Sequence, residues 1–191
     1  MLVRNTFSAV SAVLMYCLCA TIAAADVPAP GCYERVYDAA HLAAHPGQLV
    51  VRATVLVKRP DAAEAAALGT SYAARADLRI WLRGRKPSFD SLGACRVANG
   101  GLSCGGSVSA AEADDCKTDG DGVHRNCRIV RAANTGAFGI VAQSDGLVLT
   151  MLRQLELVQA PYDGGPFLYL SPGNVENHAF ALRPAPEAAC Q

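Results

Sequence analysis

A repeat of two residues, in which apolar and polar side chains alternate, constrains this sequence more than any other feature. Residues 75–85 show it most clearly, because Ala76, Leu78, Ile80 and Leu82 alternate with mostly charged residues. Successive side chains of an extended strand point to opposite faces, so the pattern predicts a strand with one buried and one wet face. A second such stretch, Leu49 to Val57, places on one face Leu49, Val51, Ala53, Val55 and Val57. Strands with one wet face are typical of antiparallel sheets.

Strand-like segments continue along the chain, separated by turn residues. We expect further strands at Ser91 to Ala98, Gly101 to Val108, Cys127 to Ala132, Phe138 to Gln143, Gly146 to Val158, Phe167 to Leu170 and His178 to Arg183. A helix is favoured at Ala39 to His45, because Asp38 can cap it and Pro46 can end it. Asp61 to Leu68 is either a second helical turn or a loop tip. The sequence therefore predicts an all-β antiparallel sandwich or barrel with one or two short helices, stapled by disulfides, as one domain over residues 26–191.

The first 25 residues have the features of a removable signal peptide. Arg4 gives a positive start, Phe7 to Ile22 are mostly apolar, and three small residues follow at Ala23 to Ala25. The apolar stretch is short for a spanning helix and contains two serines, so we expect cleavage before Asp26 rather than a retained anchor. No later segment reaches spanning length, so no stable membrane insertion is expected after cleavage.

Six cysteines follow the leader, at Cys32, Cys95, Cys104, Cys116, Cys127 and Cys190. An even number in an exported chain predicts three disulfides, although six cysteines allow 15 pairings and the sequence does not choose among them. Local geometry favours Cys95 with Cys104 and Cys116 with Cys127, since each pair flanks a turn signal, which leaves Cys32 for Cys190. Zinc bound by cysteine is disfavoured because no two of the six lie close enough in sequence.

Charge and motifs exclude several classes of function. Lys and Arg number 17, as do Asp and Glu, and loss of Arg4 with the leader leaves a net charge of −1. Such a balance gives no field to attract nucleic acid. The segment 105–109 lacks the second glycine of a hydrolase nucleophile elbow, and paired cysteines leave no free thiol. We therefore assign no catalytic residue and expect no cofactor.

The most suggestive surface is a row of outward residues on the strand 75–85, namely Arg79, Trp81, Arg83 and Arg85. Alternate positions share a face, where guanidinium groups can hold anions and stack on the indole. Aromatic and arginine residues are also enriched at interface hot spots. This row is the predicted binding surface. The alternative is structural: Trp81 is covered by other elements, and the arginines keep an edge strand soluble.

His41 and His45 are the candidate metal ligands. They stand four residues apart on the predicted helix, so both side chains can reach one ion. The residues between them supply no glutamate, so this is not a metalloprotease helix, and His124 or His178 would have to complete the site. A histidine near the end of a helix also has a purely structural explanation, because its charge complements the helix dipole.

Four segments together resemble a group of small exported proteobacterial proteins that carry no assigned activity: Tyr37 to Pro46, Leu82 to Arg85, Gly100 to Gly105, and Phe180 to Cys190. The resemblance covers most of the mature chain in patches and implies a periplasmic or secreted location. After Cys104 this chain departs from the compact glycine-rich turn of the group and runs instead through Ser107 to Asn126.

These observations predict an exported, β-rich binding or interaction module of the bacterial envelope or secretome. Its expected partner is an envelope or extracellular protein or a glycan, and no nucleic acid. The alternative is a small periplasmic hydrolase or metal-dependent enzyme that uses His41 and His45.

Overall fold

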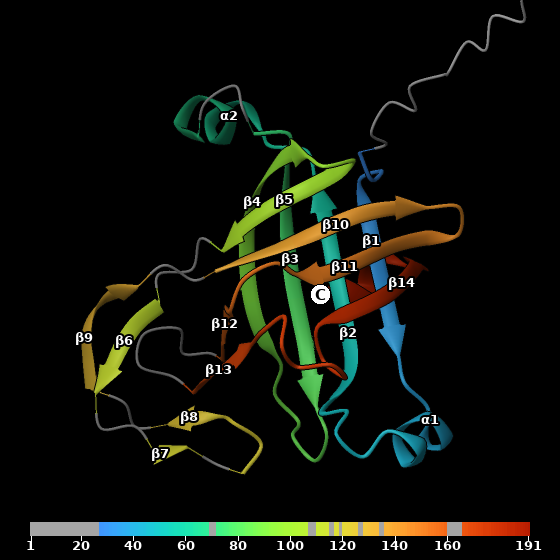
Figure 1. The fold of residues 1–191 in the computed structure, drawn as a ribbon. Helices are drawn as coiled ribbons and strands as arrows, with labels where there is room; N and C mark the ends of the chain where they lie inside the picture. The colour runs from blue at the N-terminus through green and yellow to red at the C-terminus, as the bar shows by residue number, and fades with distance from the viewer. Residues whose placement is uncertain are drawn as a thin grey trace, which may run out of the picture.

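Eight antiparallel strands close into a barrel in the computed structural model, which describes residues 27–68, 72–106, 110–114, 117–118, 120–125, 128–133, 136–159 and 166–191. The barrel follows chain order, and its last strand hydrogen-bonds to its first (Figure 1). Its strands are β1 (Gly31–Val36), β2 (Val50–Lys58), β3 (Ala74–Leu82), β4 (Phe89–Ala98), β5 (Gly101–Gly106), β10 (Ala137–Gln143), β11 (Gly146–Met151) and β14 (Ala179–Ala185). The predicted all-β fold is confirmed, as a barrel rather than a sandwich.

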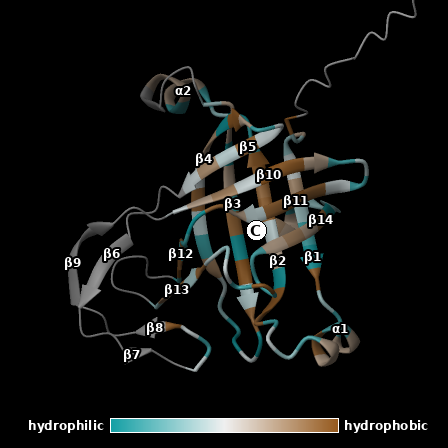
Figure 2. Cartoon of the chain, viewed as in Figure 1, coloured by the Kyte–Doolittle hydropathy of each residue, from teal (hydrophilic) through white to brown (hydrophobic). Residues whose placement is uncertain are grey.

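The inside of the barrel is filled by apolar side chains. The hydropathy colours alternate along the strands in Figure 2, because every second residue points inward. An eight-stranded barrel is just wide enough for such side chains to fill it. The largest fully buried ones on the barrel strands are Phe89, Phe138, Phe180, Leu78, Ile80, Leu82, Ile140, Leu147, Leu149 and Met151. Leu155 and Leu157, which follow β11, belong to the same apolar core.

Additional strands extend from the lower part of β4. β12 (Leu155–Val158) pairs with β4 through Val158 and Asp90, and β13 (Phe167–Leu170) pairs along β12. Beyond them lie β8 (His124–Arg125) and β7 (Lys117–Thr118), while β6 (Ala110–Asp114) and β9 (Arg128–Ala133) form a separate two-stranded sheet.

Two short helices sit at opposite ends of the barrel (Figure 1). α1 (Ala39–Ala44) connects β1 to β2, and the Asp38 side chain caps it by accepting a hydrogen bond from His41 N at 2.7 Å, as predicted. α2 (Ala62–Leu68) connects β2 to β3. A 3₁₀ turn, η1 (Glu187–Cys190), ends the chain. Among the residues described, no helix is long and apolar enough to span a bilayer.

Two of the three favoured disulfides are confirmed. Cys32 is bonded to Cys190, and Cys95 to Cys104. The predicted partners Cys116 and Cys127 lie outside the described residues. Disulfides persist in oxidising compartments, so the two bonds fit a protein that works outside the cytoplasm.

Three details of the predicted strands are wrong. The strand predicted over residues 75–85 ends at Leu82, so Arg83 and Arg85 lie beyond it. A bulge between Val50 and Arg52 shifts the inward face of β2, so Val50 is buried where Val51 was expected. The single strand predicted from Gly146 to Val158 is two strands, because the amides of Leu152 and Arg153 both donate to the Ala137 carbonyl and turn the chain away from β11.

Candidate functional site

Trp81 lies on the outer wall of the barrel beneath an arginine from the neighbouring strand. Trp81 on β3 is in register with Arg52 on β2, and the Arg52 guanidinium carbon stands 4.2 Å from the centre of the indole ring. Arg52 is held from two sides: its Nε donates to Glu34 at 2.7 Å, and its Nη2 donates to the Ala189 carbonyl at 2.8 Å. The cation–π contact is therefore fixed before any ligand arrives.

Arg79 lies beside this contact, one outward position along β3. The next row of the sheet places Glu34, Thr54, Arg79 and Asp90 in register on four neighbouring strands. Arg79 Nε donates to Asp90 at 3.0 Å, and both side chains are largely buried, with 30% and 16% exposed. We call Glu34, Arg52, Arg79 and Trp81 the tryptophan patch.

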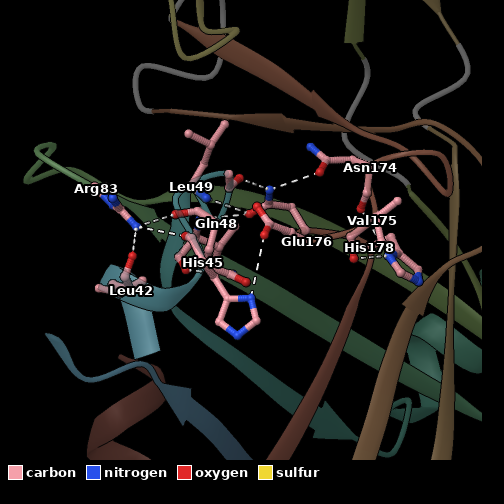
Figure 3. Close-up of polar contacts among 12 residues, drawn as sticks. Leu42, His45, Gln48, Leu49, Arg83, Asn174, Val175, Glu176 and His178 are labelled. Carbon is pink, nitrogen blue, oxygen red and sulfur yellow. Dashed lines mark hydrogen bonds and ion pairs between the residues drawn. The ribbon is translucent and has the colours of Figure 1, made fainter. Parts of the chain in front are cut away.

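The other two arginines of the predicted row leave this patch. Arg83 turns toward α1, where its Nη2 donates to the carbonyls of Leu42 at 3.0 Å, Gln48 at 3.1 Å and His45 at 3.4 Å (Figure 3). These carbonyls include those that a helix end leaves without partners. Arg85 pairs instead with Asp121, and its hydrogen bond lowers the pKa of that carboxyl. The structure thus brings Arg79 and Trp81 together and gives Arg83 and Arg85 separate roles.

A buried asparagine joins two distant loops at the α1 end of the barrel. Asn177 Oδ1 accepts from the amides of Leu49 and Val50 at 2.9 and 3.0 Å, and its Nδ2 donates to the Gly47 carbonyl at 2.9 Å. Asn177 has no exposed surface. A buried side chain with this many hydrogen bonds fixes the loop 171–178 against the start of β2.

His41 and His45 are brought together, but with their rings stacked. Tyr37, His41 and His45 form a column with ring centres 4.6 and 4.4 Å apart, and the Arg35 guanidinium carbon lies 4.8 Å from the centre of the Tyr37 ring. His45 Nδ1 lies 3.6 Å from Glu176 Oε1 (Figure 3). An ion shared by two imidazoles lies near the plane of each ring, so these stacked rings would have to turn before both could bind it.

One of the two expected third ligands, His178, does not join the two histidines. His178 lies apart from His45 in Figure 3, and its Nδ1 is 3.0 and 2.9 Å from the carbonyl oxygens of Asn174 and Val175. The side chain of His124 lies outside the described part of the structure. Within that described part, no three His, Cys, Asp or Glu side chains are grouped to hold a metal. Glu176, which sequence reasoning missed, is the acid that reaches His45.

A buried acid on β12 was also missed. Glu156 is 4% exposed and stands opposite Tyr169 of β13 in the strand register. Burial raises the pKa of Glu156, and burial together with the Glu156 carboxyl raises the pKa of Tyr169 to about 12. The pair joins β12 to β13, two of the strands added to the barrel, and belongs neither to the tryptophan patch nor to the histidine column.

Comparison with models of protein families, with curated proteins and with solved structures gave no match. The function must therefore be argued from the chemistry of these clusters.

Proposed function

We propose that this protein is an exported binding module, periplasmic or secreted after removal of its signal peptide, and that the tryptophan patch is its contact surface. The observation that carries the proposal is the indole of Trp81, held 4.2 Å below an Arg52 guanidinium that is itself fixed by Glu34 and Ala189. Tryptophan and arginine dominate interface hot spots, and side chains that are already ordered lose little entropy when they bind.

The charges of the patch favour a polar partner. Glu34 within the patch and Asp90 beside it offset Arg52 and Arg79, so this surface combines hydrogen-bond donors and acceptors with an aromatic ring and has little net charge. An envelope or extracellular protein with a polar contact surface, or a glycan, fits this combination, because hydroxyl and amide groups can bond to both charge types while apolar faces stack on the indole. Nucleic acid would require a positive field that the patch lacks.

Substitution of Trp81 and Arg52 tests this proposal. Trp81→Ala and Arg52→Gln should each weaken retention of an envelope fraction, or binding to a glycan array, by about tenfold or more, which corresponds to about 1.4 kcal/mol. Thermal unfolding should shift by only a few degrees, because both side chains lie outside the barrel interior. Arg96→Ala is the matched control, since this exposed arginine of β4 has its guanidinium carbon 4.6 Å from the centre of the Tyr72 ring and lies outside the tryptophan patch. Binding equal to that of the control, or collapse of stability in Trp81→Ala, would defeat the proposal.

A hydrolase or metal-dependent enzyme is the second candidate, and the contact between His45 and Glu176 is the observation that favours it. A carboxylate beside an exposed imidazole is an arrangement that orients a general base. Metal analysis of protein purified without chelator tests this alternative. Stoichiometric zinc that is lost in His41→Ala would support the enzyme and count against the binding module.

A further inference from the structure

The last residues of the chain cross the outer wall of the barrel beside the tryptophan patch. After β14, residues 186–191 form a strap that contains η1 and packs on β1 and β2. The strap lies outside the barrel, because it contacts the outward side chains of Cys32 and Arg52. One element therefore touches both the disulfide and the arginine that covers Trp81.

The strap covers part of the outer surface of β1 and β2 that would otherwise be exposed to water. Thr54 is an outward residue of β2, in register between Glu34 and Arg79, yet it is only 1% exposed. Cys32, outward on β1, is 5% exposed. An outward position becomes buried only when other groups lie over it, and η1 packs on both β1 and β2. We attribute the burial of Cys32 and Thr54 to the strap together with the long side chains beside them.

The disulfide is the main attachment of the strap. None of the residues of η1 is buried, and no side chain caps its start. Besides its packing on β1 and β2, one described hydrogen bond links it to the wall, from Arg52 to the Ala189 carbonyl. A terminal segment with so little buried surface stays in place only when it is tied down, so the Cys32–Cys190 bond decides whether the strap is closed.

The two described disulfides differ in how exposed their cysteines are to solvent. Cys190 is part-exposed at the end of the strap, whereas Cys95 and Cys104 have no exposed surface in the barrel interior. Thiol–disulfide exchange requires the attacking thiolate to reach a sulfur atom, and movement of the strap alone, without opening of the barrel, is enough to expose the Cys190 sulfur. Reduction of Cys95–Cys104 requires the strands around it to open first.

We propose that Cys32–Cys190 is a redox latch that holds the strap closed beside the tryptophan patch and opens on reaction with a dithiol reductant. A thiolate of the dithiol attacks Cys190 and forms a mixed disulfide, and Cys32 leaves as a thiolate that takes up a proton. The second thiol of the reductant then attacks the mixed disulfide and releases Cys190. The disulfide gains two electrons and two protons, and the dithiol becomes a cyclic disulfide.

Opening of the latch changes the patch in two ways. Arg52 loses the Ala189 carbonyl, one of the two partners that hold it over the indole, and Thr54 becomes accessible beside Glu34. The latch thus controls how much of the contact surface is accessible and how firmly Arg52 is held over Trp81. The biological purpose rests on the proposed function, but the opening itself does not.

Three measurements on the full chain test the latch. After treatment with dithiothreitol under native conditions, alkylation mapped by mass spectrometry should modify Cys32 and Cys190 at least about tenfold faster than Cys95 and Cys104. Amide exchange should increase in residues 186–191, and far-UV circular dichroism should retain the sheet signal. Emission from Trp81, the one tryptophan in the chain, should shift as its arginine contact loosens.

Two variants provide the reference states. Cys32→Ala with Cys190→Ala should show the open emission without reductant and no further shift with it. Oxidised Arg52→Ala gives the emission of Trp81 without the guanidinium. Equal reactivity of the two disulfides, unchanged exchange in 186–191, or loss of the sheet signal together with the first reduction would overturn the latch. A Trp81→Ala chain that still binds its partner would defeat the contact surface instead and leave these results unaffected.

Discussion

The disulfide between Cys32 and Cys190 allows a direct test of what stabilises the barrel. It joins residues separated by 158 positions, whereas Cys95 and Cys104 are separated by 9. In the chain-entropy account a crosslink restricts the unfolded chain, and its effect grows with the logarithm of the loop length. This account assigns about 5 kcal/mol to the long loop and about 2.5 kcal/mol to the short one.

Replacement of Cys32 and Cys190 by alanine should therefore lower the free energy of unfolding by about 5 kcal/mol. At about 2–4 °C per kcal/mol for a domain of this size, Tm should fall by about 10–20 °C. Urea unfolding followed by circular dichroism measures the free energy, and a thermal scan gives Tm. The folded spectrum should not change, because β1 keeps its hydrogen bonds to both β2 and β14.

The hairpin disulfide provides the comparison. Cys95→Ala with Cys104→Ala should lose about 2.5 kcal/mol from the shorter loop, with an added packing cost because both sulfurs lie in the core. A loss below about 2 kcal/mol in the Cys32 and Cys190 variant would refute the loop-length reasoning. So small a loss would mean that the bond contributes only the local contacts of the strap.

Three further predictions concern buried groups. Asn177→Ala should cost about 3 kcal/mol in urea unfolding, because it leaves buried backbone groups of two loops without partners. Gly136→Ala should cost more than about 3 kcal/mol, since φ is +89° there and a Cβ would overlap the Gln154 carbonyl oxygen; Gly105→Ala, which has open space, is its control. The raised pKa of Glu156 means that the folded state binds the proton more tightly, so wild-type stability should fall as pH rises from the ordinary glutamate range through the raised pKa. Glu156→Gln should remove this pH dependence of the free energy of unfolding, measured across the mildly acidic to neutral range, and an unchanged dependence would contradict the assignment.

The sequence predicted a strand best where one face of the strand is buried and the other is polar along its whole length. β3 has barrel interior on one side and charged wall on the other, so its alternation is clean and its inward residues Ala76, Leu78, Ile80 and Leu82 are all buried. β1 was missed as a strand. Its outward Cys32 is buried under the strap and its inward Tyr33 is buried in the core, so adjacent residues are both covered and the period of two disappears.

The site was predictable only in part. The sequence placed Arg79 and Trp81 on one face, but Arg52 and Glu34 come from other strands, and strand register cannot be read from spacing within one segment. Arg83 shares the alternation of this row, yet the chain turns at Gly84 and its guanidinium reaches α1 instead. A contact that depends on which strands become neighbours has no local sequence signal.

The seam between β1 and β14 has a consequence for how the molecule acquires its shape. Cys32 finds its register partner at Ala185, so the ring cannot be completed until strands from the two extremes of the described chain meet. Folding with such long-range contacts is slow, because the entropy of closing the loop is lost before the contacts form. We expect refolding on a timescale of milliseconds to seconds or longer, because β1 cannot complete its pairing before β14 has formed.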